Sequence, residues 1–67
     1  MVKISITDEL PPANEYVVLW SSDKKAPPTI GWATYWHPQN SFGGFEVSDQ
    51  AYLEDYGKEF THWMPLP

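Results

Sequence analysis

Apolar and polar residues alternate at the start of the chain and then give way to two longer apolar runs. In residues 2–6 (VKISI) they follow the two-residue period of a half-buried strand. The run 16–21 (YVVLWS) is β-branched and aromatic, which predicts a central strand with both faces covered. The run 29–36 (TIGWATYW) predicts a further strand. One face holds Ile30, Trp32, Thr34 and Trp36, and the other holds Gly31, Ala33 and Tyr35.

The segments between these runs have the composition of turns. The prolines at 11 and 12 end the first strand because they cannot donate to a sheet, and Asn14 is suited to a positive φ. Residues 22–28 form a polar loop that closes on two prolines. The small residues Gly31 and Ala33 indicate that something approaches their face closely, either a packed neighbour or a ligand.

The second half of the chain predicts a short strand, a short helix and a last strand. Residues 37–41 form a turn, and the pair Gly43–Gly44 fits either the centre of a tight hairpin or a bulge before a strand at 45–47. Ser48 and Asp49 can cap a helix over 49–56, which Gly57 ends. The helix has Leu53 and Tyr56, or Tyr52, on its apolar stripe.

The last strand covers 59–64. Its apolar ending must dock on the rest of the domain, and the prolines at 65 and 67 stop it. We therefore expect one domain, 1–67, of the mainly β (α+β) class. It is a small antiparallel sheet or open barrel of four to five strands with one short helix before the last strand.

The amino-acid composition limits the ways in which such a domain can be stabilised and the partners and locations that we expect for it. The chain has 67 residues and no cysteine, so stability must come from its four tryptophans, four tyrosines and three phenylalanines, from oligomerisation, or from both; a homodimer is one option. The net charge of −5, without arginine, disfavours direct nucleic-acid binding. Because no apolar run has the length of a membrane span or a signal peptide, we expect a cytoplasmic protein without membrane contact.

Three stretches together resemble one known family. They are the opening 4–11 (ISITDELP), the strand 17–20 (VVLW) and the closing run 61–67 (THWMPLP). This pattern is similar to the phage and prophage family known as domain of unknown function 551, and it extends from one end of the chain to the other. The resemblance implies a small accessory protein of a phage or prophage, located in the host cytoplasm. It implies no activity. The positions that match its motifs are Leu10, Pro11, Trp20, His62, Trp63, Met64 and Pro65.

The chain departs from the family pattern at three places. Lys3 stands where the family usually has tryptophan, Asn14 stands where glycine is common, and the region 42–56 carries no family motif. The first departure leaves an N-terminal pocket unfilled or re-used. The third allows a function in that region that differs from relatives.

The chemistry-bearing residues do not form a catalytic pattern. His62 shares its predicted strand face with Phe60 and Met64, which favours a hydrogen-bonded structural histidine over a catalytic one. His37 and His62 are 25 positions apart without cysteine, which is a weak metal signal. The sequence has no nucleophile motif and no glycine-rich phosphate loop. We therefore expect no enzyme, no cofactor and no metal.

The aromatic residues near the turn at 37–41 are the predicted contact site. Four tryptophans are difficult to bury completely in 67 residues, so one or two should lie at the surface as binding anchors. We expect Trp36 and Tyr35 first, and Trp32 with Gly31 second. The predicted set for a protein partner is Tyr35, Trp36, His37, Phe42 and Phe45.

Two functions remain open. The first is a non-enzymatic protein that binds a host bacterial protein and inhibits or modulates a defence or regulatory factor. The alternative is an oligomeric sponge that stacks a nucleotide base between aromatic rings, with Lys24, Lys25 or Lys58 at the phosphate. The scarcity of basic residues counts against the sponge.

Overall fold

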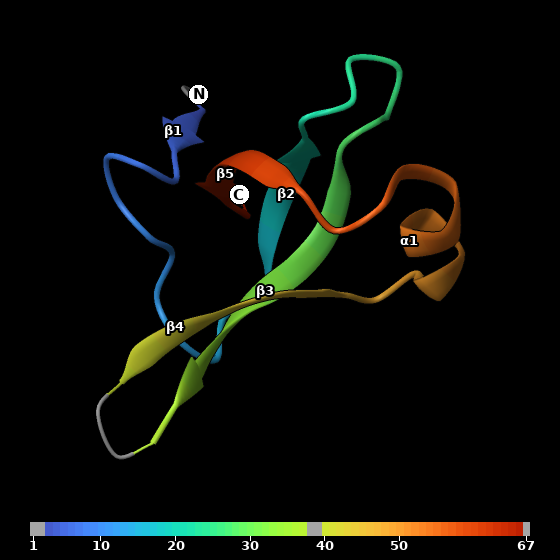
Figure 1. Ribbon diagram of the computed structural model, residues 1–67. Helices are drawn as coiled ribbons and strands as arrows, with labels where there is room; N and C mark the ends of the chain where they lie inside the picture. The colour runs from blue at the N-terminus through green and yellow to red at the C-terminus, as the bar shows by residue number, and fades with distance from the viewer. Residues whose placement is uncertain (1–2, 38–39, 67) are drawn as a thin grey trace.

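A computed structural model describes residues 3–37 and 40–66, which form one five-stranded antiparallel sheet and one helix. Figure 1 shows the sheet with the helix beside it and with the N-terminal segment passing along one side. The strand order is β1-β5-β2-β3-β4. The elements are β1 (Ile4–Ser5), β2 (Val17–Ser21), β3 (Thr29–Trp36), β4 (Ser41–Val47), α1 (Gln50–Tyr56) and β5 (Phe60–Pro65). The fold class predicted from the sequence is confirmed: the protein is mostly β, with an open sheet and one short helix before the last strand.

The connections explain this strand order. β2, β3 and β4 follow one another as hairpins, because polar turns separate apolar runs. α1 then carries the chain back, so that β5 pairs with β2 on one side and with β1 on the other. The strand β2 is central, as predicted. Its faces differ, because Val17 and Leu19 are buried whereas Val18 and Trp20 are only half-buried. The expectation of two covered faces was therefore correct for one face only.

The strand and helix bounds differ from the predicted ones by a few residues. β1 is shorter than the alternation suggested, since Asp8 and Glu9 donate to the carbonyl of Ser5 in a turn; residue 2 lies outside the described residues. β4 begins earlier, at Ser41. The interior of the predicted turn, residues 38 and 39, also lies outside the described residues. The helix begins after Asp49, whose carboxylate accepts from the amide of Ala51, and it ends before Gly57 at φ 80°.

Two bulges decide which side chains face inward. Tyr35 pairs with Phe42 while Thr34 pairs with Gly44, so Gly43 is the extra residue and Gly44 takes φ 115°. The glycine pair is therefore a bulge within β4, one of the two predicted possibilities. A second irregularity lies between Trp20 and Ser21, which pair with His62 and Phe60.

The second bulge corrects one predicted face. Phe60 is buried in the core, 4% exposed, whereas His62 lies opposite Trp20 on the other side of the sheet. Phe60 and His62 therefore do not share a face, because the irregular register interrupts the two-residue period.

The core lies on one face of the sheet, here called the inner face. It holds Val17, Leu19, Ala33, Phe45, Val47, Tyr52, Phe60 and Trp63. Aromatic rings cross it in successive contact, from Tyr35 through Phe42, Phe45 and Phe60 to Tyr52 and Tyr56, with centroids 4.9 to 6.1 Å apart. Phe45 and Phe60 belong to strands that are not neighbours, so the sheet curls around this row.

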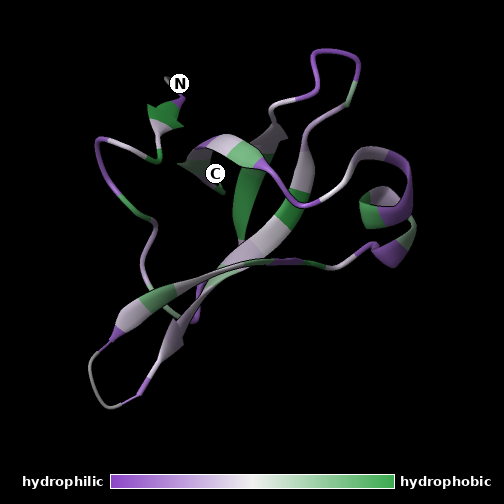
Figure 2. Cartoon of the chain, viewed as in Figure 1, coloured by the Kyte–Doolittle hydropathy of each residue, from purple (hydrophilic) through white to green (hydrophobic). Residues whose placement is uncertain are grey.

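The helix and the N-terminal segment cover the inner face. Tyr52 of α1 donates its hydroxyl to the carbonyl of Pro27, 2.7 Å away. The buried Pro11 accepts from the hydroxyl of Tyr35, and the indole N–H of Trp63 donates to the carbonyl of Glu9 at 2.9 Å. Asn14 turns the segment at φ 63°, as its residue type predicted. Hydrophobic colour concentrates on the central strands, and hydrophilic colour marks the β2–β3 loop (Figure 2).

The small side chains on β3 lie against packed neighbours. A Cβ at Gly31 would lie 2.2 Å from the carbonyl oxygen of Glu46 and 2.8 Å from a methyl carbon of Leu19. Ala33 forms a parallel bridge with Ala13 of the N-terminal segment. Of the two possibilities that the sequence left open, the packed neighbour is the one present at Gly31 and Ala33.

Candidate binding face

The structure divides the predicted contact set between two sides of the sheet. Phe45 is 8% exposed and belongs to the core, and Tyr35 and Phe42 are half-buried in the same aromatic row. Trp36 is 66% exposed and His37 is also exposed. The five residues therefore offer no single surface. Trp36 and His37 are accessible to a partner, whereas the other three stabilise the fold.

A different set of side chains gathers on the face opposite the core, here called the outer face. The register places Ser5, His62 and Trp20 in one cross-strand row, and Met64, Val18 and Ile30 in the next. Trp32 lies opposite Glu46 in a third row, which Tyr16 extends by an edge-on ring contact with Trp32. Trp36 follows at the end of β3. Alternating residues of all five strands thus build the outer face.

The outer face is partly open to solvent. Tyr16 is 61% exposed and Ile30 is 43% exposed, while Trp20, Trp32, His62 and Met64 are half-buried. Helix α1 and the N-terminal segment lie on the other side of the sheet, so no element of the described chain covers these residues. Contiguous exposed aromatic and aliphatic side chains on a small protein are typical of an interaction surface.

The outer face contains a hollow beside Trp32. It measures about 230 Å³ and is lined by Asn14, Glu15, Tyr16 and Trp32. A second hollow of about 340 Å³ continues from it along the end of β3 to His37 and Asn40. Both exist because β2 pairs with β3 only as far as Gly31, which leaves the rest of β3 beside the turn at Asn14. The rings of Tyr16 and Trp32 meet at 88°, with centroids 5.5 Å apart, and form an aromatic corner.

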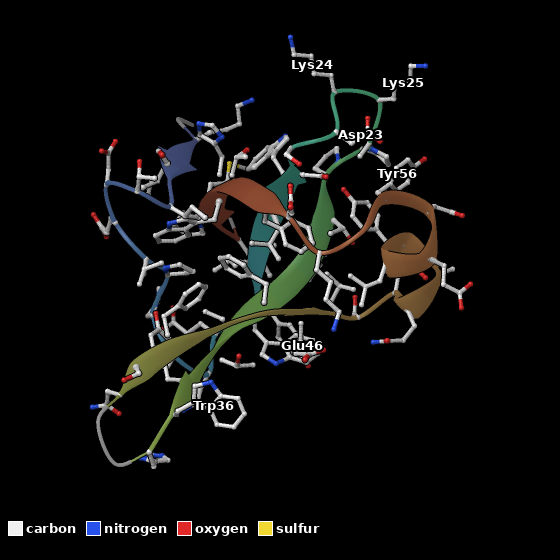
Figure 3. The ribbon with its side chains drawn as sticks, viewed as in Figure 1. Asp23, Lys24, Lys25, Trp36, Glu46 and Tyr56 are labelled. Atoms are coloured by element: carbon white, nitrogen blue, oxygen red, sulfur yellow. The ribbon has the colours of Figure 1, made fainter. Side chains whose placement is uncertain are left out.

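Charge is distributed unevenly around the sheet. Glu15 lines the first hollow, and Glu46 shares the outer face with Trp32 because the two residues pair directly. Figure 3 shows Glu46 and Trp36 on the same side of the β3–β4 hairpin, with Lys24 and Lys25 at the far end of the molecule. Lys3 lies over the ring of Trp20, its Nζ 5.3 Å from the ring centroid. One carboxylate, that of Glu15, therefore stands in the wall of the first hollow, and Glu46 lies on the other side of Trp32.

The two histidines have different neighbours. The Nδ1 of His62 is 2.9 Å from the hydroxyl of Thr61, and its row neighbours are Ser5 and Trp20. His37 lines the second hollow. Among the described residues, His, Asp and Glu form no group of three that could hold a metal ion. The prediction that His62 is a hydrogen-bonded residue in a strand agrees with its contact to Thr61.

The residues of the proposed family signature divide between the faces. Pro11 and Trp63 are buried and joined to the rest of the domain by hydrogen bonds. Trp20, His62 and Met64 lie on the outer face, and Pro65 pairs with Val17. Leu10 is 39% exposed in the N-terminal segment. The closing run thus supplies both core and surface, and its docking on the domain is confirmed for residues 60–65.

Sequence reasoning missed Glu15, Tyr16 and Ile30 as parts of the exposed face. Tyr16 shares the two-residue period of Val18 and Trp20, and Ile30 shares that of Trp32, so the signal was present in each strand. The sequence did not show which strands are neighbours. That pairing brings Tyr16 to Trp32 and places the hollow between them.

Together the fold and this face define a small open-sheet protein with a buried aromatic side and an exposed aromatic side. The chain belongs to the family described as protein of unknown function (DUF551), whose model matches residues 4–67. The resemblance identified from the sequence is thereby confirmed. Neither a curated protein nor a solved structure matched the chain. In the described part of the chain, the helix is too short and too polar to cross a membrane.

Proposed function

We propose that this protein is a non-enzymatic interaction protein that binds another protein through its outer face. The observation that supports this is the uncovered, contiguous surface of Tyr16, Ile30, Trp32 and Trp36 on a sheet whose other face is fully used as core. Aromatic side chains of this kind commonly supply most of the binding free energy at protein interfaces. Following the family resemblance, the partner is a bacterial host protein, and occupation of its surface inhibits or modulates a defence or regulatory function.

The exposed area of the chain supports this proposal. A monomer of 7.7 kDa exposes about 4300 Å² according to the scaling of surface with mass. The chain exposes 4724 Å². One partner in a standard interface buries about 800 Å². An open sheet with one bare face provides such an area without any change in fold.

The nucleotide sponge is less well supported. Cationic side chains make the strongest hydrogen bonds to the phosphate of a nucleotide. The residues lining the two hollows include no lysine, and the first hollow has Glu15 in its wall. Lys24 and Lys25 lie at the far end of the molecule (Figure 3).

The test is native mass spectrometry of the tagged protein purified gently from its bacterial host. We expect a stoichiometric additional polypeptide with the wild-type chain, and its loss with Ile30→Ser combined with Trp36→Ser. Leu10→Ser is the matched control, because Leu10 is also exposed but lies in the N-terminal segment that covers the inner face. An added mass of a few hundred daltons in place of a polypeptide would support the sponge. Equal recovery of the polypeptide with wild type and the double variant would contradict the proposed face.

Trp36 and Ile30 are better test positions than Phe42. The ring of Phe42 contacts both Tyr35 and Phe45 in the aromatic row of the core. Its removal would weaken the fold together with any binding, so loss of the partner would have two explanations. Trp36 and Ile30 are exposed, and their replacement leaves the core unchanged.

A further inference from the structure

The hollow beside Trp32 combines three features that recognise a cation. Its walls include two aromatic rings at nearly a right angle, those of Tyr16 and Trp32. Glu15 lines it. Glu46 lies on the opposite flank of Trp32, in the direct cross-strand position. An aromatic face attracts a cation through its negative quadrupole, and a carboxylate nearby adds a direct Coulomb attraction.

The four lysines of the chain, all of them among the described residues, do not line the hollow. The chain contains four basic residues, all of them lysines. Lys3 lies over Trp20, Lys24 and Lys25 are in the β2–β3 loop, and Lys58 follows α1. None of them lines either hollow. The contact of Lys3 with Trp20 shows that the outer face already supports one lysine–tryptophan contact in a neighbouring row.

We propose that the hollow formed by Glu15, Tyr16 and Trp32 binds an arginine or lysine side chain presented by the partner protein, with Glu46 on the other side of Trp32. This inference rests on the proposed function and names the chemistry of the partner: a basic segment. The choice of a cation follows from charge complementarity, since the site is acidic, the chain carries a net charge of −5, and no lysine of the same chain reaches the hollow. A guanidinium or ammonium group on an extended stem can reach the rings while the partner's backbone stays at the rim.

The first experiment uses the isolated protein and a small probe. The tripeptide Ac-Gly-Arg-Gly-NH₂ is titrated into ¹⁵N-labelled protein, and the indole N–H signal of Trp32 is followed. We expect a saturable shift with a Kd in the millimolar range, because a single cation beside two rings and a carboxylate makes few contacts. The buried indole of Trp63 serves as the internal reference and should not shift. The same peptide with citrulline in place of arginine has the same shape without the charge, and it should give no saturable shift.

Variants separate local recognition from overall charge. Glu15→Gln combined with Glu46→Gln should weaken the peptide about three- to tenfold, as expected for two exposed charge pairs. Glu54→Gln combined with Asp55→Asn makes the same change in net charge on the exposed side of α1, and it should leave the Kd within about twofold. The Trp32→Leu variant has no indole signal at this position, so the backbone amide of Glu15 is followed instead. The peptide should no longer shift that amide signal, and a spectrum typical of the folded protein confirms that the loss is local.

Three results would overturn the inference. The first is an equal response to the citrulline peptide. The second is unchanged binding by the Glu15→Gln/Glu46→Gln variant. The third is a Trp32 signal that moves with protein concentration alone and stops moving in a Lys24→Gln/Lys25→Gln variant, because the occupant is then a second copy of this chain.

The outcomes for the hollow and for the proposed function are distinguishable. Binding of the arginine peptide without any co-purified polypeptide would leave the cation site standing and remove the proposed function. A co-purified polypeptide that binds the Glu15→Gln/Glu46→Gln variant with unchanged affinity would support the proposed function and contradict the cation site. The partner would then use the outer face without placing a cation beside Trp32.

Discussion

At the scale of single residues, two glycines of the sheet lie too close to their neighbours to accept a side chain without some movement. Gly31 has no room for a side chain, because a Cβ would meet the main-chain carbonyl of Glu46. Gly43 also lacks room, but there the obstacle is the indole of Trp36, which is 66% exposed and can rotate into solvent. The two glycines therefore differ in what must move when a methyl group is added.

Gly31→Ala and Gly43→Ala form a matched pair that tests this difference. We expect Gly31→Ala to lower the free energy of unfolding by about 2–3 kcal/mol, the cost of overpacking a core whose neighbour is backbone. For a domain of this size that corresponds to a fall in Tm of at least about 8 °C. Gly43→Ala should lower the free energy of unfolding by less than about 1 kcal/mol, because only the exposed Trp36 indole must move. Urea unfolding of both variants measures the difference, and equal costs would show that the β3–β4 pairing adjusts freely around Gly31.

At the scale of elements, α1 is attached to the sheet through Tyr52. This residue is 5% exposed, its ring stacks on Phe60, and its hydroxyl donates to the carbonyl of Pro27. Burial raises the pKa of Tyr52 above its usual value of 10.0, because the phenolate would lose its hydration. The contribution of the neutral phenol to stability is therefore complete below pH 10.0. It is lost as the pH rises from that value through the higher pKa of the folded state.

Tyr52→Phe tests this attachment in two pH ranges. Near neutral pH the variant should be less stable by about 1 kcal/mol, because the hydrogen bond to Pro27 is lost. Above pH 10 its free energy of unfolding should fall less steeply than that of wild type. Tyr16→Phe is the control, since Tyr16 is 61% exposed and lies outside the core. Urea unfolding between pH 7 and 11 measures the slopes, and parallel curves for wild type and Tyr52→Phe would exclude this role.

The elements also show how far the sequence predicts the structure. β2 and β3 were predictable because β-branched and aromatic residues fill them without interruption, and the helix was predictable from Asp49 and Gly57. The early part of β4 was not, because its glycines favour a turn until β3 is beside them. The face of Phe60 was missed because the bulge opposite Trp20 and Ser21 interrupts the alternation.

The candidate site was predictable only in part, for the same reason. Trp36 was identified as an exposed anchor from its position at the end of a strand, and its exposure agrees with that prediction. The hollow beside Trp32 depends on contacts between Tyr16 and Trp32 and between Trp32 and Glu46, which lie on different strands. Such contacts depend on which strands pair and in which register, and the pattern of a single sequence does not show that pairing.

At the scale of the whole molecule, the two faces of one sheet have separate tasks. The inner face holds the aromatic row and is covered, so a change there alters stability. The outer face is bare, so a change there can alter binding while the fold persists. A protein of 67 residues without cysteine has a small free energy of unfolding. Because the two faces are separate, tryptophans can lie on the surface while the core stays fully packed.

The net charge of −5 acts at this same scale, because it surrounds the hollow with a field that attracts a basic partner. We expect the association rate constant with the co-purified partner to fall about tenfold or more between 10 and 150 mM salt, as the Debye length shortens from about 30 to about 8 Å. The dissociation rate constant should change much less. Stopped-flow mixing at several salt concentrations gives both values.

Two charge-matched variants separate the long-range field from local contact. Glu54→Gln with Asp55→Asn and Glu15→Gln with Glu46→Gln each remove two charges, so both should slow association at low salt. Only the second pair should also accelerate dissociation, because a contact charge acts after the partner has docked, whereas a distant charge acts during the approach. An association rate that is independent of salt would mean that the partner is not basic. Faster dissociation in the helix variant as well would mean that the partner also contacts α1, and the interface would then extend beyond the outer face.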